Sequence, residues 1–248
     1  MIKEGANILD VGGLSTRPGA DEVSEEEETR RVVEGIKALR EAGIEIPTSV
    51  DTYRAGVARE ALKAGASCVN DVRAGLEDGM LEVMARSSVP VVLMHSRGTP
   101  KTMGSLTDYD ASSSIVDSVR LSLLSSVQAA LAAGVKKWNI LLDPGLGFAK
   151  TASQNLELLS RLDELTKEGS GLEGYPVLVG GSRKRFVGEV TGVEVPRERV
   201  GGSLGVVAAC YLGGGGNRGR TTKVVRVHDT KETRELIGVL EAVGRGRV

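Results

Sequence analysis

Short apolar runs alternate with longer segments of helical period along the whole chain, and this alternation limits the folds that the chain can adopt. The runs are apolar at consecutive positions, Val89–Met94 being the clearest, as in strands buried on both faces of a parallel sheet. Seven strands are predicted in this way, at residues 7–11, 47–51, 67–71, 89–94, 138–143, 175–180 and 223–227. The alternation predicts a parallel α/β fold.

Helices are predicted between these strands. Ser24 and Glu27 form a capping-box pattern before one helix, and Asp229 and Glu232 cap the last one. Apolar residues then recur three or four positions apart in four segments: Val32, Val33, Ile36 and Leu39; Ile115, Val119, Leu123, Val127 and Leu131; Leu156, Leu159, Leu162 and Leu165; Leu236, Val239, Leu240 and Val243. Gly5 is predicted to be a helix C-cap, and the Gly-rich stretch 213–222 a surface loop.

Composition excludes several classes of protein. With 40% hydrophobic residues the chain is too apolar to be disordered, and no run of about 18 apolar residues is available to cross a membrane. Lys and Arg total 32 against 33 Asp and Glu, without the basic excess typical of general nucleic-acid binding. Cys68 and Cys210 are too few for a disulfide framework and are predicted to be core residues. We therefore expect neither a nucleic-acid partner nor a membrane partner.

Polar residues follow nearly every predicted strand, and they bear on the architecture. In an eight-stranded barrel the carboxyl ends of the strands meet at one mouth, whereas an open doubly wound sheet spreads them along an edge. A polar residue at almost every end favours the barrel. The residues concerned are Asp51, Asn70, Asp71, His95, Asp143, Ser182, Arg183, Lys184, Arg226 and His228.

Each of these residues also has a purely structural interpretation. Asp51 and Asp71 are placed to cap the following helix, and Asp143 precedes Pro144-Gly145, where a turn competes with a binding role. Arg17 and Lys184 are also interpretable as solvated loop charges. The set carries more weight than any member, because chance would scatter such residues over both ends of the strands.

The residue types predict the chemistry of a ligand. Asp51, Asn70 and Asp143 offer acceptors to a flat heterocycle with several N–H groups. Arg17, Arg226 and His228 are donors suited to an anion such as pyrophosphate. Ser182-Arg183-Lys184 opens a predicted helix, whose N-terminus favours a carboxylate or phosphate. The expected ligand is a polar heterocycle joined to an anionic group.

Six segments in order along the chain resemble dihydropteroate synthase: Gly12–Gly19, Ser49–Thr52, Val69–Val72, Leu142–Phe148, Gly181–Lys184 and Arg226–Asp229. The resemblance implies a TIM (β/α)8-type barrel that condenses 6-hydroxymethyl-7,8-dihydropterin diphosphate with p-aminobenzoate. The products are 7,8-dihydropteroate and pyrophosphate, the reaction belongs to folate biosynthesis, and Mg²⁺ assists it. Sulfonamides compete with p-aminobenzoate in this family.

The resemblance also implies roles for individual residues. Asp51, Asn70 and Asp143 would bind the edge of the pterin ring, while Lys184 would contact the pterin and order the p-aminobenzoate site. Arg226 would pack on the pterin and, with His228, hold the diphosphate. The remaining roles would be closure of a loop by Thr16 and Arg17, and lining of the substrate pockets by Pro18, Met94, Phe148 and Ser182. No side-chain nucleophile is required.

Two departures from the family pattern bear on activity. Leu14 stands where the family commonly has Glu. The first strand, most of the first helix and the metal ligand of that strand have no counterpart, so a single domain over 1–248 with about seven strands and no metal ligand of its own is predicted. An incomplete gene model, a fragment of a fused folate-synthesis chain, or a remnant that binds pterin weakly would each explain this.

Partners and alternatives follow from the same comparison. The resemblance implies a homodimer and, in some relatives, fusion to upstream folate-pathway domains; the compartment is left open between cytoplasm and mitochondrial matrix. The alternatives are a catalytically impaired pterin-binding fragment and a pterin-dependent methyltransferase domain. Ser182-Arg183-Lys184 and Ser15–Gly19 argue against the methyltransferase, since they belong to the diphosphate and p-aminobenzoate chemistry.

Overall fold

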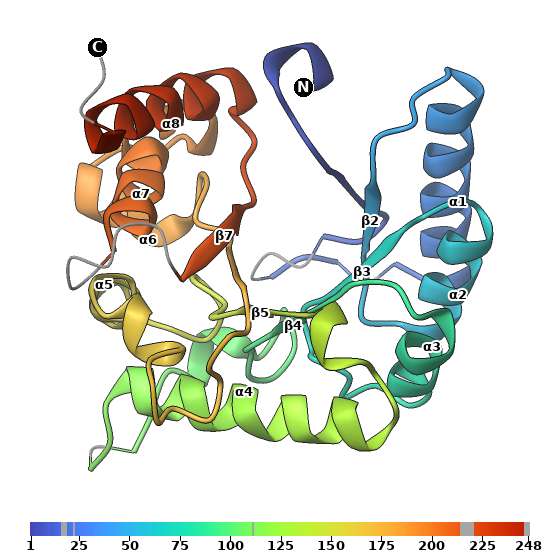
Figure 1. Cartoon of the computed structure of the whole chain (residues 1–248), viewed down its shortest axis with the longest axis horizontal. Coiled ribbons are helices and arrows are strands. Elements are labelled where there is room, and N and C mark those ends of the chain that lie inside the picture. Colours follow the sequence, from blue (N-terminus) through green and yellow to red (C-terminus); the bar gives the residue numbers. More distant parts are fainter. Residues whose placement is uncertain (16–18, 22, 111, 214–220, 246–248) are drawn as a thin grey trace. The chain divides into compact units, whose positions relative to one another are not determined.

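A computed structural model describes residues 1–15, 19–21, 23–110, 112–213 and 221–245 of the chain (Figure 1). The chain divides into two compact units. The β1–β5 unit comprises Asn7–Leu106 and Leu121–Asp143, and the β6–β7 unit comprises Met1–Ala6, Thr107–Arg120 and Pro144–Val248. The single domain expected over 1–248 stays a prediction.

Five parallel strands form the sheet of the β1–β5 unit, each paired with the next in the chain. Each lies within two residues of a predicted run, so the periodicity located them well. Parallel neighbours joined by helices are the expected product of buried apolar runs that alternate with amphipathic segments. The strands are β1 (Leu9–Gly12), β2 (Thr48–Asp51), β3 (Cys68–Asp71), β4 (Val91–Met94) and β5 (Ile140–Asp143).

The register divides the side chains of this sheet between two faces, because successive residues of a strand point to opposite sides. One face is mainly apolar, and six of its apolar residues have no exposed surface: Val50, Val69, Val91, Leu93, Ile140 and Leu142. The opposite face carries polar residues toward the carboxyl ends of the strands, namely Asp10, Ser49, Asp51, Asn70 and Asp143. The apolar face builds the core, and the polar face carries the predicted acceptors.

Helices α1 (Glu25–Glu41), α2 (Ala55–Lys63) and α3 (Met80–Ser87) follow β1, β2 and β3 and stand beside β2 and β3 (Figure 1). The Ser24 side chain caps α1 by accepting a hydrogen bond from the Glu27 backbone N–H at 3.2 Å. Only this half of the predicted capping box is found, because the Glu27 carboxylate binds Arg30 and Arg31 instead.

Helix α4 (Ile115–Ala132) precedes β5 and confirms the prediction for that segment. It is long and apolar enough to cross a membrane, a test that core helices of water-soluble proteins also pass. Its Val119, Leu123 and Val127 side chains are buried in the protein. Its first six residues fall in the β6–β7 unit and the rest in the β1–β5 unit.

The β6–β7 unit holds two parallel strands, β6 (Val177–Val179) and β7 (Thr222–Val225), as predicted. Helix α7 packs against α6, α8 and β7 (Figure 1). A 3-10 helix at Ile2–Glu4 contacts α8 and ends at Gly5, whose φ of +106° confirms the predicted C-cap. The helices are α5 (Ala152–Ser160), α6 (Arg185–Thr191), α7 (Val200–Leu212) and α8 (Thr230–Arg245). Further 3-10 turns of this unit lie at Leu162–Leu165 and Pro196–Glu198, and those at Met103–Ser105 and Lys137–Asn139 belong to the β1–β5 unit.

Two helix predictions in this unit need correction. The Leu156–Leu165 segment is not one helix, because α5 ends at Ser160 and a 3-10 turn continues from Leu162. In α8 the predicted apolar face is wrong in part, since Val239 is 63% and Val243 75% exposed. The predicted loop at 213–222 falls mostly on residues 214–220, which lie outside the described residues.

Candidate functional site

The polar face of the β1–β5 sheet brings together four of the predicted site residues at its carboxyl-terminal edge. Asp51 lies directly opposite Asn70 on β3, and Met94 lies opposite Asp143 on β5. Asn70, Met94 and Asp143 are each buried to 95% or more. This edge therefore offers an acid, an amide, a thioether and a second acid in a row across four strands.

Asp10 belongs to the same group and was not predicted. Its Oδ2 accepts a hydrogen bond from Asn70 Nδ2 at 3.1 Å, and its Oδ1 accepts one from the Ser49 hydroxyl. These bonds link β1 to β2 and β3 and fix the Asn70 amide with Nδ2 engaged. The available signal was a carboxylate in the middle of an otherwise apolar strand, which is costly to bury without polar partners.

Asp71 and His95 follow the strands but play different parts. The Asp71 carboxylate accepts hydrogen bonds from the Arg73 and Gly75 backbone N–H groups at 2.8 and 2.6 Å and so holds the turn that follows β3. It does not cap the following helix as predicted, because α3 begins only at Met80 and has Gly79 at its N-cap. Burial raises the pKa of Asp71 to about 6, and these two N–H groups oppose that rise. The His95 backbone N–H donates to the Asp143 carbonyl at 2.9 Å, so it extends the β4–β5 pairing by one residue.

The Cys68 thiol shares the polar face, and its environment disfavours the thiolate. Burial raises the pKa of Cys68 to about 12, and the nearby Asp10 charge adds to the effect. Cys210 is buried on α7, as predicted for a core residue. Cys68 itself is half-buried. A thiol so hard to ionise is a poor nucleophile.

Lys184 organises the site residues of the β6–β7 unit. Its Nζ donates a hydrogen bond to the Leu146 carbonyl and lies 4.5 Å from the centroid of the Phe148 ring, within cation–π range. A Cβ atom at Gly147 would lie only 2.8 Å from Lys184 Cδ, and the φ there is +78°. Glycine at 147 is therefore required for this approach.

Arg226 lies close to the same lysine. A Cβ atom at Gly180 would lie 3.7 Å from Arg226 Cβ and 4.0 Å from Lys184 Nζ, so both side chains border this glycine. Gly180 immediately follows β6, and the Arg226 backbone N–H donates to Val179 at 2.9 Å. The segments after β6 and β7 thus place the Lys184 and Arg226 side chains next to the backbone of Gly180, which has no side chain of its own.

Ser182 and His228 form a second pair at these strand ends. The Ser182 hydroxyl lies 3.0 Å from His228 Nδ1 and accepts from the His228 backbone N–H at 3.3 Å. Arg183, the residue after Ser182, has a φ of +62°. Its guanidinium forms a bidentate ion pair with the Asp229 carboxylate. Asp229, predicted as a helix cap, is therefore the partner of Arg183 instead.

The loop after β5 is held by two buried residues that were not predicted. Asn155, with no exposed surface, accepts from the Gly147 backbone N–H at 2.6 Å and donates to the Thr151 carbonyl at 2.7 Å. Lys150 Nζ donates to the Gly145 and Phe148 carbonyls at 2.9 and 3.1 Å. These bonds fix the backbone that presents Leu146 and Phe148 to Lys184.

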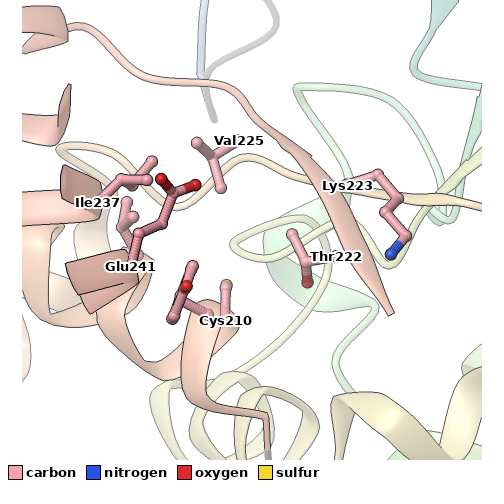
Figure 2. A pocket seen from close by; sticks show the side chains of 8 residues that line it. Cys210, Thr222, Lys223, Val225, Ile237 and Glu241 are labelled. Atoms are coloured by element: carbon pink, nitrogen blue, oxygen red, sulfur yellow. The ribbon is translucent and has the colours of Figure 1, made fainter. Parts of the chain in front are cut away.

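Three predicted residues, Thr16, Arg17 and Pro18, lie outside the described residues. A cavity of about 200 Å³ lies in the β6–β7 unit between α7, β7 and α8, where Cys210, Val225 and Glu241 face it (Figure 2). None of the predicted site residues is among those that line it: Val207, Cys210, Tyr211, Thr222, Lys223, Val225, Ile237 and Glu241.

Comparison with curated proteins gives consistent matches. The profile of the pterin binding enzyme family matches residues 1–228. The dihydropteroate synthase of Synechocystis sp. is 44% identical over 246 residues, which are 99% of this chain and 80% of that protein. The folic acid synthesis protein fol1 of Schizosaccharomyces pombe is 46% identical over 244 residues, 98% of this chain but only 32% of that protein. A segment like this chain thus forms about a third of the longer fol1 protein.

The solved structures that this chain matches are also dihydropteroate synthases. Xanthomonas albilineans dihydropteroate synthase, bound to 4-aminobenzoic acid, matches with a TM-score of 0.87 and 40% identity over 98% of this chain and 81% of that one. The Burkholderia cenocepacia enzyme, complexed with 7,8-dihydropteroate, gives a TM-score of 0.87 and 37% identity over 99% and 84%. The α/β fold of TIM-barrel type is confirmed. The chain belongs to the pterin-binding enzymes and, among them, to the dihydropteroate synthases, the transferases of folate biosynthesis.

Proposed function

We propose that this chain joins 6-hydroxymethyl-7,8-dihydropterin diphosphate to p-aminobenzoate, releasing pyrophosphate and 7,8-dihydropteroate. The observation that carries the proposal is the register of the β1–β5 sheet, which sets Asp51 beside Asn70 and Met94 beside Asp143 on its polar face. Such a row of acceptors suits the N–H-rich edge of a pterin. Relatives bound to 4-aminobenzoic acid and to 7,8-dihydropteroate support this substrate and this product.

The acceptors bind and orient the pterin in this proposal. Asp51 and Asp143 accept from ring N–H groups, and Asn70 adds its carbonyl oxygen, because its Nδ2 is engaged by Asp10. Met94, buried beside Asp143, packs against an apolar part of the substrate. Asp10 thus acts on the ligand through the amide of Asn70.

The cationic residues stabilise the leaving group. The bond between the methylene carbon and the diphosphate oxygen breaks, the amine of p-aminobenzoate forms the new C–N bond and loses one N–H proton to solvent, and pyrophosphate departs. Negative charge grows on the leaving diphosphate, where Arg226 and His228 bind it and Ser182 orients the His228 ring. Lys184 and Phe148 contact the pterin and order the p-aminobenzoate pocket. The roles of Thr16, Arg17 and Pro18 rest on the sequence resemblance.

Mg²⁺ remains part of this proposal. The described part of the chain has no group of three or more His, Cys, Asp or Glu side chains placed to hold a metal ion, so these residues do not fit a protein cage for it. Mg²⁺ commonly keeps several waters and binds through substrate phosphates with one or two carboxylates. The roles given above do not depend on the ion.

The decisive experiment measures pyrophosphate release from the pterin diphosphate and p-aminobenzoate, with Mg²⁺ and with EDTA. Turnover that requires both substrates supports the proposal, and its loss in EDTA supports the ion. Pterin binding by calorimetry without turnover would identify an impaired pterin-binding chain. Methyl transfer from methyltetrahydrofolate to a corrinoid would identify a methyltransferase and overturn the proposal.

The proposal extends to assembly. The resemblance to dihydropteroate synthases implies a homodimer, and the fol1 relative supports a place for this kind of chain within a longer folate-synthesis protein. Light scattering during size-exclusion chromatography tests the homodimer. A mass near the 26.0 kDa of one chain at every concentration would contradict it.

A further inference from the structure

Helix α1 buries a carboxylate that the proposed reaction does not use. Glu28, in the first turn, has no exposed surface and lines up with Val32 and Ile36, four and eight residues further along the buried stripe. A lone charge in such a place costs several kcal/mol, so its partners must offset that penalty. Glu26, in the same turn of the helix, is exposed, so an acidic side chain at this end of α1 can stay in contact with solvent.

The partners of Glu28 come from the segment that follows β2. Its Oε1 accepts a hydrogen bond from the Thr52 hydroxyl at 2.6 Å, and its Oε2 accepts from Arg54 Nη1 at 2.7 Å. Arg54 Nη1 also donates to the Val23 carbonyl at 2.8 Å, which ties the entry of α1 to the same cluster. Both carboxylate oxygens are therefore committed to residues one and three positions beyond Asp51.

The segment after β1 packs against the same helical turn. A Cβ atom at Gly13 would lie 2.7 Å from the Glu28 backbone carbonyl, so only glycine permits the contact. Arg31 Nη1 donates to the Gly13 carbonyl at 3.2 Å. The turn of α1 that carries Glu28 thus contacts the chain beyond β1 and beyond β2 together.

Thr52 transmits this anchoring to the polar face of the sheet. It is the residue after Asp51, it is almost fully buried, and its backbone N–H donates to the Asn70 carbonyl at 3.1 Å. A side chain that holds the Thr52 hydroxyl therefore restrains Asp51 on one side and the β2–β3 pairing on the other. Asp51 and Asn70 are the two acceptors assigned to the pterin edge.

We propose that Glu28 is a positioning residue for pterin recognition, which orients Asp51 by holding Thr52 and Arg54. The inference rests on the proposed function and adds a residue to it. The carboxylate is required because both of its oxygens accept. In a Glu28→Gln variant, the charge that pairs with Arg54 is removed and one side of the amide presents N–H groups, so the restraint on Asp51 is weakened.

The test compares Glu28→Gln with Glu26→Gln, which removes an exposed charge from the same helical turn. Calorimetry should show pterin diphosphate binding weakened about tenfold by Glu28→Gln, the loss expected for one charge-assisted hydrogen bond, and unchanged by Glu26→Gln. The KM for p-aminobenzoate should change less than twofold. A purely structural role would lower the melting temperature and the active fraction but leave the pterin affinity of the folded molecules unchanged.

Thr52→Val provides a second route if Glu28→Gln does not fold, because it removes one hydroxyl and keeps the shape. It too should weaken pterin binding, and combining the two substitutions should cost less than the sum of the single effects, since both remove the same contact. Wild-type affinity in folded Thr52→Val, or in folded Glu28→Gln, would overturn the inference. Absence of pterin binding by the wild-type chain would instead overturn the proposed function.

Discussion

Lys184 Nζ lies 4.5 Å from the centre of the Phe148 ring and donates to the carbonyl of Leu146, two residues before that ring. The contact joins the N-cap residue of α6 to the loop that follows β5. Because Gly147 has no Cβ, the lysine stem lies directly against the backbone between its two partners. These contacts hold the Lys184 ammonium group in one orientation without a bound ligand.

Lys184→Ala should abolish measurable pterin binding, because it removes a pre-aimed donor and its contact with Phe148. Lys184→Arg should recover little, since a planar fork does not replace a point charge against the Leu146 carbonyl. Lys167→Ala, which removes an exposed lysine paired with Glu164, is the matched control and should bind normally. Calorimetry with the pterin diphosphate decides the matter, and unchanged affinity in Lys184→Ala would reject this placement.

His228→Gln should raise the KM for the pterin diphosphate by about tenfold, the loss expected when one charge-assisted bond to phosphate is removed. Ser182→Ala should give a smaller rise, because the His228 ring loses the hydroxyl 3.0 Å from Nδ1 but keeps its reach. The KM for p-aminobenzoate should hold steady in both. Equal rises for both substrates would argue that these residues support the fold and do not bind the diphosphate.

Asn155→Ala should lower the free energy of unfolding by about 3 kcal/mol, because the fully buried Asn155 side chain is lost together with its hydrogen bonds to the Gly147 N–H and the Thr151 carbonyl. Leu156→Ala, on the same helix but 42% exposed, is the control and should cost less than about 1 kcal/mol. Urea denaturation measures both. A comparable cost for the two variants would contradict the clamp described for the loop after β5.

Stability should depend on pH through Asp71. Burial raises its pKa in the folded protein from an ordinary 3.8 to about 6, so the native state binds the proton more tightly than the unfolded chain. The contribution of Asp71 to the free energy of unfolding therefore falls as pH rises from about 4 to about 6, by an amount on the order of 3 kcal/mol, and then levels off. Asp71→Asn removes this contribution and costs a pH-independent amount at the hydrogen bond with Gly75.

The measurement compares urea unfolding of the wild type and Asp71→Asn at several pH values across this window. The advantage of the wild type over the variant should shrink between pH 4 and pH 6. An advantage that stays constant with pH would show that Asp71 does not hold its proton more tightly in the folded state.

The strands and many of their terminal residues were predictable because both follow from local pattern. Buried parallel strands are apolar at consecutive positions, and a polar residue that ends such a run, as Asp51 or Asp143 does, stands out in the sequence. Asp10 was not found because it lies inside its strand, where only the register reveals Ser49 and Asn70 as neighbours. Asn155 was missed for the same reason: its partners lie on a loop whose course no periodicity encodes.

Other predictions failed where tertiary contacts override local preference. Asp229 precedes a helix, which predicts a cap, but the positive φ of Arg183 brings a guanidinium to its carboxylate. Leucine spacing predicted an unbroken helix to Leu165, and the structure tightens into a 3-10 turn after Ser160. The roles predicted for Arg226, His228 and Lys184 in binding substrate stay predictions.

Asn70 and Asp71 are adjacent, yet one faces the ligand side of the sheet and the other holds the next turn. Inserting or deleting one residue within β3 would exchange these assignments, because the two faces of a strand alternate. The loops around β3 can lengthen or shorten over evolutionary time with little penalty. Within the strand, only an insertion or deletion of two residues keeps each side chain on its own face. A change in the length of β3 by one residue would therefore also change which side chains face the proposed pterin site.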